Sequence, residues 1–250
     1  MLAPRSRPNI RLVEQDNSSL PDKGSGGRNG RDSIPFALPG RPRLAELFAA
    51  SDDMGAAGFA LAQIPRRSRL LWVQQRMVEL ETGRPCGAGL ERFGVDPDRL
   101  VLACARNAAD VLWTMEEGLK CRSLTVIAGE LWGNPRALDF TATKRLAFRA
   151  ERQKVHIYLI RVAGRPDLSA ARERWNISSC PSVADPHNPK APGRPRWQAE
   201  LFRARGRPPG LWQACYDPAA HRLDLVPALS DGALAEAASP TVPIGRTRSG

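Results

Sequence analysis

Residues 50–59, ASDDMGAAGF, follow an apolar run and precede a helical pattern, which is where α/β proteins carry a phosphate-binding loop. Such a loop needs the pattern G-x-x-x-x-G-K-[ST], because its lysine reaches the terminal phosphates and its hydroxyl binds Mg²⁺. This segment contains neither lysine nor arginine, and Asp52 and Asp53 would repel phosphate groups. The sequence therefore predicts a protein without a working phosphate loop.

Glu130 is the one carboxylate placed like an active-site group, at the end of the apolar run LTVIAGEL (124–131). The second apolar run ends in Gln74 and Gln75, so that run supplies no carboxylate to activate water. The chain also lacks a G-x-S-x-G elbow and a convincing Ser/His/Asp or Cys/His set. A structural role is favoured for Glu130, and the sequence predicts no catalytic residue and no enzyme.

Five cysteines and three histidines are scattered along the chain without C-x-x-C spacing. This argues against a zinc site and against a disulfide framework, and unpaired cysteines are typical of a reducing cytosol. No apolar run approaches the ~20 residues of a membrane helix, and the basic N-terminus has no apolar segment of a signal peptide. We expect a cytoplasmic protein that needs no cofactor, no metal and no membrane.

Arg145 and Arg149 are candidate contact residues because, with Arg152, they recur at helical spacing opposite Leu146 and Ala150. Such a stripe can follow a phosphate backbone, but a solvated helix face gives the same pattern and is the favoured interpretation.

Trp132 and Arg136 form a second candidate pair in the loop LWGNPRALDF (131–140). An aromatic ring beside a cation can stack on a base or dock a partner, although Trp132 can equally belong to the core.

The chain is strongly basic, with 37 Lys+Arg against 26 Asp+Glu and a net charge of +11; only five of the 37 are lysines. Residues 1–43 and 163–250 each carry +4, and the longer segment 44–162 carries +3. This distribution favours peripheral contact with nucleic acid or an acidic partner, or a general compositional bias. Residues 205–208, RGRP, also match the core of a minor-groove hook, but the hairpin expected there needs glycine and proline anyway.

Short apolar runs alternate with helical patterns over residues 44–162. Near-continuous apolarity is typical of parallel strands that helices cover on both faces. The alternation predicts right-handed βαβ units and an α/β fold with a doubly wound, mainly parallel sheet. Strands are expected at 44–50, 69–74, 100–105, 124–131 and 155–162, and helices at 55–63, 87–93, 108–120 (N-cap Asn107) and 142–154 (N-cap Thr141).

After residue 162 the pattern changes to strands at 171–179, 196–206 and 211–217, which we expect to form an antiparallel β extension. The predicted organisation is a disordered arm rich in Gly, Ser, Asn and Pro, an α/β core, a β-rich extension of the same domain, and a flexible tail. Their expected ranges are 1–40, 41–165, 166–231 and 232–250.

Several stretches between about 44 and 225 resemble the ImuA family: RNAADVLWTMEEGLKC (106–121), VIAGEL (126–131), LDFTATKRLAFRAE (138–151), SAARERWNISS (169–179) and PRWQAELFRARGRPPGLW (195–212). The most specific parts are A-A-D-x-L-W-x-M-E-E-G-L and D-x-T-A-T-x-R-L, whereas residues 1–33 match nothing in the family. The resemblance implies a RecA-like fold and a role in the SOS response to DNA damage. The implied partners in error-prone translesion synthesis are ImuB, a catalytically inactive relative of Y-family polymerases, and an error-prone replicative-type polymerase α subunit, with RecA and DNA as further candidates.

In RecA-like folds the loops after the later strands face DNA, so fold position adds three arginines to the candidate contacts. The resulting set on that side is Trp132, Arg136, Arg165, Arg172 and Arg174. Three functions are compatible with the resemblance: a non-enzymatic adaptor of mutagenic repair, a SulA-like inhibitor of cell division, and a weak NTPase with a degenerate loop. The failed phosphate-loop pattern and the family motifs favour the adaptor.

Overall fold

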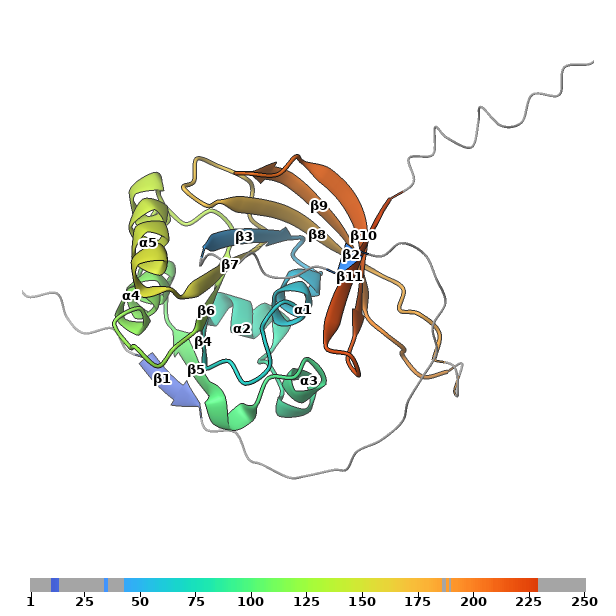
Figure 1. Ribbon diagram of the computed structural model, residues 1–250. Coiled ribbons are helices and arrows are strands. Elements are labelled where there is room, and N and C mark those ends of the chain that lie inside the picture. The colour runs from blue at the N-terminus through green and yellow to red at the C-terminus, as the bar shows by residue number, and fades with distance from the viewer. Residues whose placement is uncertain (1–9, 14–33, 36–42, 186–187, 189, 229–250) are drawn as a thin grey trace, which may run out of the picture.

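The protein is described by a computed structural model covering residues 10–13, 34–35, 43–185, 188 and 190–228. One mixed sheet runs through it, with α4 and α5 on one side and α1, α2 and α3 on the other (Figure 1). The α/β class and the helices on both faces are confirmed, but the sheet as a whole is mixed: its first half is parallel and its C-terminal strands are antiparallel. The expected tail at 232–250 and most of the expected arm at 1–40 lie outside the described residues.

Parallel strands form the first half of the sheet, in the order β5-β4-β6-β7-β3. The chain runs from β4 to β5 in one direction along the sheet and from β6 to β7 in the other. The connections that leave the adjacent carboxyl ends of β4 and β6 therefore lead in opposite directions. All of these strands were predicted within about two residues. They are β3 (Leu44–Ala49), β4 (Leu70–Gln75), β5 (Leu100–Ala105), β6 (Val126–Trp132) and β7 (His156–Val162).

The C-terminal strands continue the same sheet beyond β3. β8 (Glu173–Cys180) pairs parallel with β3 and antiparallel with β9 (Arg196–Ala204), so the expectation that this segment is wholly antiparallel was wrong on one side. β10 (Gly210–Asp217) and β11 (Arg222–Pro227), which was not predicted, complete the antiparallel extension.

Two short strands lie within the arm that was predicted to be disordered. β1 (Ile10–Val13) pairs antiparallel with β5, and β2 (Ile34–Pro35) pairs antiparallel with β11. Backbone pairing at the two edges of the sheet therefore orders these segments, which polar composition alone did not predict.

Side-chain carboxylate and amide groups fix the starts of the two long helices, α4 (Ala108–Gly118) and α5 (Phe140–Gln153). Asn107 caps α4 as predicted, accepting the Asp110 backbone N–H at 3.0 Å. The predicted cap of α5, Thr141, was wrong: Asp139 accepts the Ala142 N–H at 2.7 Å. A carboxylate at this position also suits the positive end of the helix dipole. The shorter helices are α1 (Gly55–Leu61), α2 (Arg76–Thr82, not predicted), α3 (Gly87–Arg92) and the 3-10 turn η1 (Pro97–Arg99).

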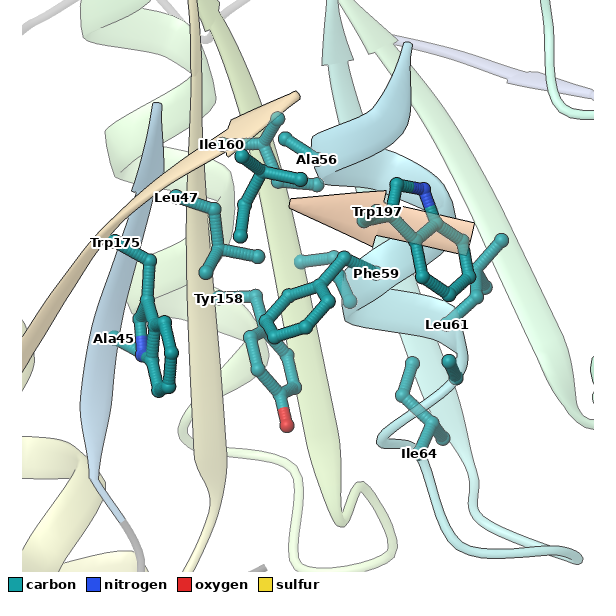
Figure 2. Packing of buried hydrophobic residues seen from close by; sticks show 14 of the residues in the cluster. Ala45, Leu47, Ala56, Phe59, Leu61, Ile64, Tyr158, Ile160, Trp175 and Trp197 are labelled. Carbon is teal, nitrogen blue, oxygen red and sulfur yellow. The ribbon is translucent and has the colours of Figure 1, made fainter. Parts of the chain in front are cut away.

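Two apolar clusters lie on the two faces of the sheet. The first packs α1, α2 and α3 against the parallel strands and the inner face of the extension; Figure 2 shows Phe59 of α1 beside Tyr158 and Trp197. The ring centroids of Phe59 and Trp197 are 6.0 Å apart. The second cluster places Met115 of α4 and Leu146 of α5 against the other face. Each parallel strand contributes side chains to the two clusters in alternation, which is why its sequence is apolar almost throughout.

Candidate contact surface at the sheet edge and on two helices

Asp53 accepts hydrogen bonds within the β3–α1 turn, where a phosphate loop would hold its ligand. Its Oδ1 accepts the Gly55 backbone N–H and the Ser179 hydroxyl, each at 2.6 Å, and its Oδ2 accepts the Ser179 N–H at 2.7 Å. Partial burial alone would raise the pKa of Asp53, but these hydrogen bonds outweigh it and hold the pKa below its ordinary value. The carboxylate thus uses donors that a phosphate would need, and it ties α1 to β8.

Glu130 lies on β6 beside Gln74 of β4 and is completely buried. Burial raises the pKa of Glu130 to about 7, and the neighbouring Trp72 and Gln74 side chains offset only part of that rise. No cation of the described residues lies within ion-pair distance of this carboxyl group. Because water does not reach it either, the arrangement fits the structural role favoured from the sequence.

Asn134 joins the two loops that leave the carboxyl ends of β6 and β7. Its Nδ2 donates to the Arg165 carbonyl at 2.9 Å, and its Oδ1 accepts the Arg165 N–H at 2.6 Å. The Arg136 and Arg165 side chains are exposed on these loops. Trp132 is half-buried against the first cluster, and its backbone N–H donates to Gln75 Oε1 at 2.9 Å. Two predicted contact arginines are therefore brought to one edge of the sheet, while Trp132 serves mainly as packing.

Arg174 lies inside the protein, so its predicted place on the contact surface was wrong. It is 3% exposed, its Nε donates to Glu46 at 2.6 Å, and its guanidinium stacks 5.3 Å from the Phe48 ring centroid. Arg172, two residues earlier, is at the surface but pairs with Glu151 at 2.6 Å. Of these two predicted contact arginines, Arg172 is therefore accessible to solvent and Arg174 is not.

Glu46 and Arg161 belong to a buried ion network that was not predicted. Both are fully buried, and Arg161 Nη1 lies 3.8 Å from Glu46 Oε1 and 3.6 Å from Asp167 Oδ1. Burial lowers the pKa of Arg161, while the two carboxylates oppose that change. The available signal was a single acid in the run LAELFAA and a single arginine in VHIYLIRV, since isolated charges in buried strands must find partners.

Arg145 and Arg149 of α5 converge on one carboxylate of α4. Their guanidinium groups lie 2.9 Å and 2.7 Å from the two oxygens of Glu116. Leu146 and Ala150 are buried on the opposite side, as predicted. The expected basic stripe exists, but two of its members share one carboxylate in an interhelical ion cluster.

Exposed aromatic rings accompany this cluster, and sequence reasoning missed them. Trp113 of α4 and Phe148 of α5 are both exposed, so with Glu116, Arg145 and Arg149 they define what we call the α4–α5 face. The signal was present: Trp113 falls outside the apolar periodicity of its helix, and Phe148 falls outside the buried stripe of α5.

The RGRP segment forms part of the fold rather than a free hook. Arg207 donates to Glu173 at 3.1 Å and stacks 4.9 Å from the Trp175 ring centroid. Gly206 has φ +97, which favours glycine in the turn between β9 and β10. The hairpin interpretation of these residues is supported.

The chain is similar to Protein ImuA of Caulobacter vibrioides, in each of two strains, at 32% identity over 164 residues. The match covers 60% of this chain and 64% of the relatives' length, slightly less than two thirds of those proteins. No protein-family model matches the chain. The resemblance to the ImuA family that the motifs predicted is confirmed.

Among the described residues, no helix has both the length and the apolarity needed to cross a membrane.

Proposed function

From its similarity to ImuA, we propose that this chain is a non-enzymatic, RecA-like adaptor of SOS-induced, error-prone translesion DNA synthesis. The similarity at 32% identity is the observation that carries the proposal. The internal use of Asp53 at the β3–α1 turn supports it, because the Gly55 N–H of that turn and the Ser179 N–H of β8 both bind the protein's own carboxylate. The closed environment of Glu130 supports it in the same way.

The proposed partners are an ImuB-type protein and an error-prone polymerase α subunit, with RecA and DNA as further candidates. An adaptor needs surfaces rather than a catalytic pocket, and two regions of this molecule offer them. Arg136 and Arg165 are exposed at the carboxyl edge of the sheet, and the α4–α5 face carries exposed aromatic and arginine side chains. Aromatic and arginine residues are enriched at protein interfaces.

Deletion of the gene and binding to the purified partners test this proposal. We expect the deletion strain to lose ultraviolet-induced mutagenesis, and the purified chain to co-elute with the ImuB-type protein in gel filtration without added nucleotide. Unchanged induced mutagenesis, or no binding to either polymerase component, would contradict the adaptor role.

The same experiments separate the two alternatives. Arrest of cell division on overproduction, with mutagenesis unaffected by deletion, would favour a SulA-like inhibitor. A rise in melting temperature with millimolar ATP would favour a weak NTPase, because a ligand that binds only the folded state stabilises it.

A further inference from the structure

Among the described residues, the large aromatic side chains exposed by more than a third all lie on α4 and α5. Trp113 is 42% exposed, Phe140 is 41% and Phe148 is 65%. The other tryptophan, tyrosine and phenylalanine side chains of the described residues are buried or half-buried. Among the described residues, one helix layer therefore holds the large aromatic side chains that folding leaves exposed to water.

The ion cluster places Trp113 and Phe148 on one continuous surface. α4 and α5 lie side by side on one side of the sheet (Figure 1), and Glu116 joins them through Arg145 and Arg149. Trp113 stands one helical turn before Glu116, and Phe148 is adjacent to Arg149. The two rings therefore flank an ordered pair of arginines.

The charge around Phe148 has an unpaired positive surplus. Lys144 and Arg152 lie one turn before and one turn after Phe148, and neither forms an ion pair within the described part of the chain. The neighbouring carboxylates are already engaged: Glu116 with two arginines, Glu117 with Lys120 and Glu151 with Arg172. A complementary surface must therefore be acidic around an apolar centre.

The cluster favours a protein ligand over a nucleic acid. Arg145 and Arg149 direct guanidinium donors at Glu116, which is only 15% exposed at its side chain, and turning those donors to phosphates would weaken both ion pairs. A partly buried carboxylate without a partner is costly, and it would also repel the phosphates. Arginines held in place by an ion pair lose little freedom when a protein docks on them.

We propose that the α4–α5 face docks an acidic segment of a partner protein that inserts an apolar side chain between Trp113 and Phe148. The inference rests on the proposed function and assigns that segment to the ImuB-type partner. Phe148 is the apolar anchor, and Lys144 and Arg152 supply the electrostatic attraction.

Titration of the purified full-length chain with the ImuB-type protein tests the proposal. We expect Phe148→Ala to weaken binding at least tenfold and Lys144→Glu with Arg152→Glu to weaken it and reduce its salt dependence. The matched control is Leu80→Ala, because Leu80 is 66% exposed on α2, in the opposite helix layer. We expect this control to bind within twofold of wild type.

Each result has one meaning. Binding of Phe148→Ala within twofold of wild type, or equal weakening by Leu80→Ala, overturns the assignment of the face while leaving the adaptor role intact. If the wild-type chain does not bind the ImuB-type protein, both the proposal that this protein is a partner and the present inference are overturned. Single-stranded DNA binding that is lost in Phe148→Ala identifies a nucleic acid as the occupant and overturns the inference.

Discussion

At the scale of single residues, Glu130 is an acid that the fold isolates from water. Its pKa of about 7 in the folded protein lies above the ordinary 4.5, so the folded state retains a proton that the unfolded state loses between these pH values. The free energy of unfolding should therefore fall as pH rises from 4.5 to 7, by roughly 3 kcal/mol for this group. Glu130→Gln should abolish that contribution, as measured by urea denaturation at pH 5 and pH 8.

Glu81→Gln is the matched control for Glu130→Gln, because Glu81 is exposed on α2. We expect the control to retain the wild-type difference in unfolding free energy between the two pH values. An equal difference in wild type and Glu130→Gln would show that the buried carboxyl group does not titrate as described.

Arg174 and Arg172 provide a direct comparison of a buried and an exposed ion pair. Arg174→Ala leaves the fully buried Glu46 without its nearest cation, which should cost about 3–5 kcal/mol of unfolding free energy. Arg172→Ala breaks a surface pair with Glu151 and should cost less than about 1 kcal/mol. Chemical denaturation of the two variants checks both values; equal costs would contradict the buried network.

Prediction of single residues failed where a charged side chain is buried. Residues 172–174, Arg-Glu-Arg, look like part of a surface strand. Nothing near them in the sequence shows that Arg174 pairs with the buried Glu46. By contrast, Leu146 and Ala150 were assigned correctly to the buried face of α5, since helical periodicity alone decides their burial. Pairings between distant strands need the topology, which a single sequence does not specify.

At the scale of elements, the N-cap of α5 was expected at Thr141, whereas the structure has it at Asp139. Asp139→Ala removes the acceptor of the Ala142 N–H and should destabilise the protein by about 1 kcal/mol. Thr141→Ala should have little effect, because Thr141 is an exposed residue within the first turn. Thermal or urea denaturation compares the two; a larger loss for Thr141→Ala would restore it as the cap.

The central strands could be predicted, whereas α2 and β11 could not, for a physical reason. Parallel strands under two helix layers must be apolar on both faces, so they stand out in sequence. α2 buries only Val78, and β11 buries only Leu223 and Leu225, so neither has a strong periodic signal. The candidate contact residues behaved similarly. The exposed loop arginines could be proposed from the sequence, whereas the α4–α5 face requires knowing that these two helices lie side by side.

At the scale of the whole molecule, the 37 lysine and arginine side chains differ in how available they are to a ligand. Arg174 and Arg161 are buried with carboxylates, and Arg145 and Arg149 share Glu116. Arg136 and Arg165 are exposed on adjoining loops and form no ion pair within the described ranges. A long-range attraction for nucleic acid should therefore depend on the second kind of arginine.

This division yields a prediction for the proposed DNA contact. Binding of single-stranded DNA should weaken steeply with salt, and Arg136→Ala with Arg165→Ala should reduce the slope of log K against log salt by about 1 to 2. The matched pair Arg145→Ala with Arg149→Ala removes the same formal charge from side chains that share the Glu116 carboxylate, so it should change the slope less. Fluorescence anisotropy over a salt series measures both slopes. A larger change in the second pair would place DNA on the α4–α5 face, and an unchanged slope in the first would remove the sheet edge from the contact.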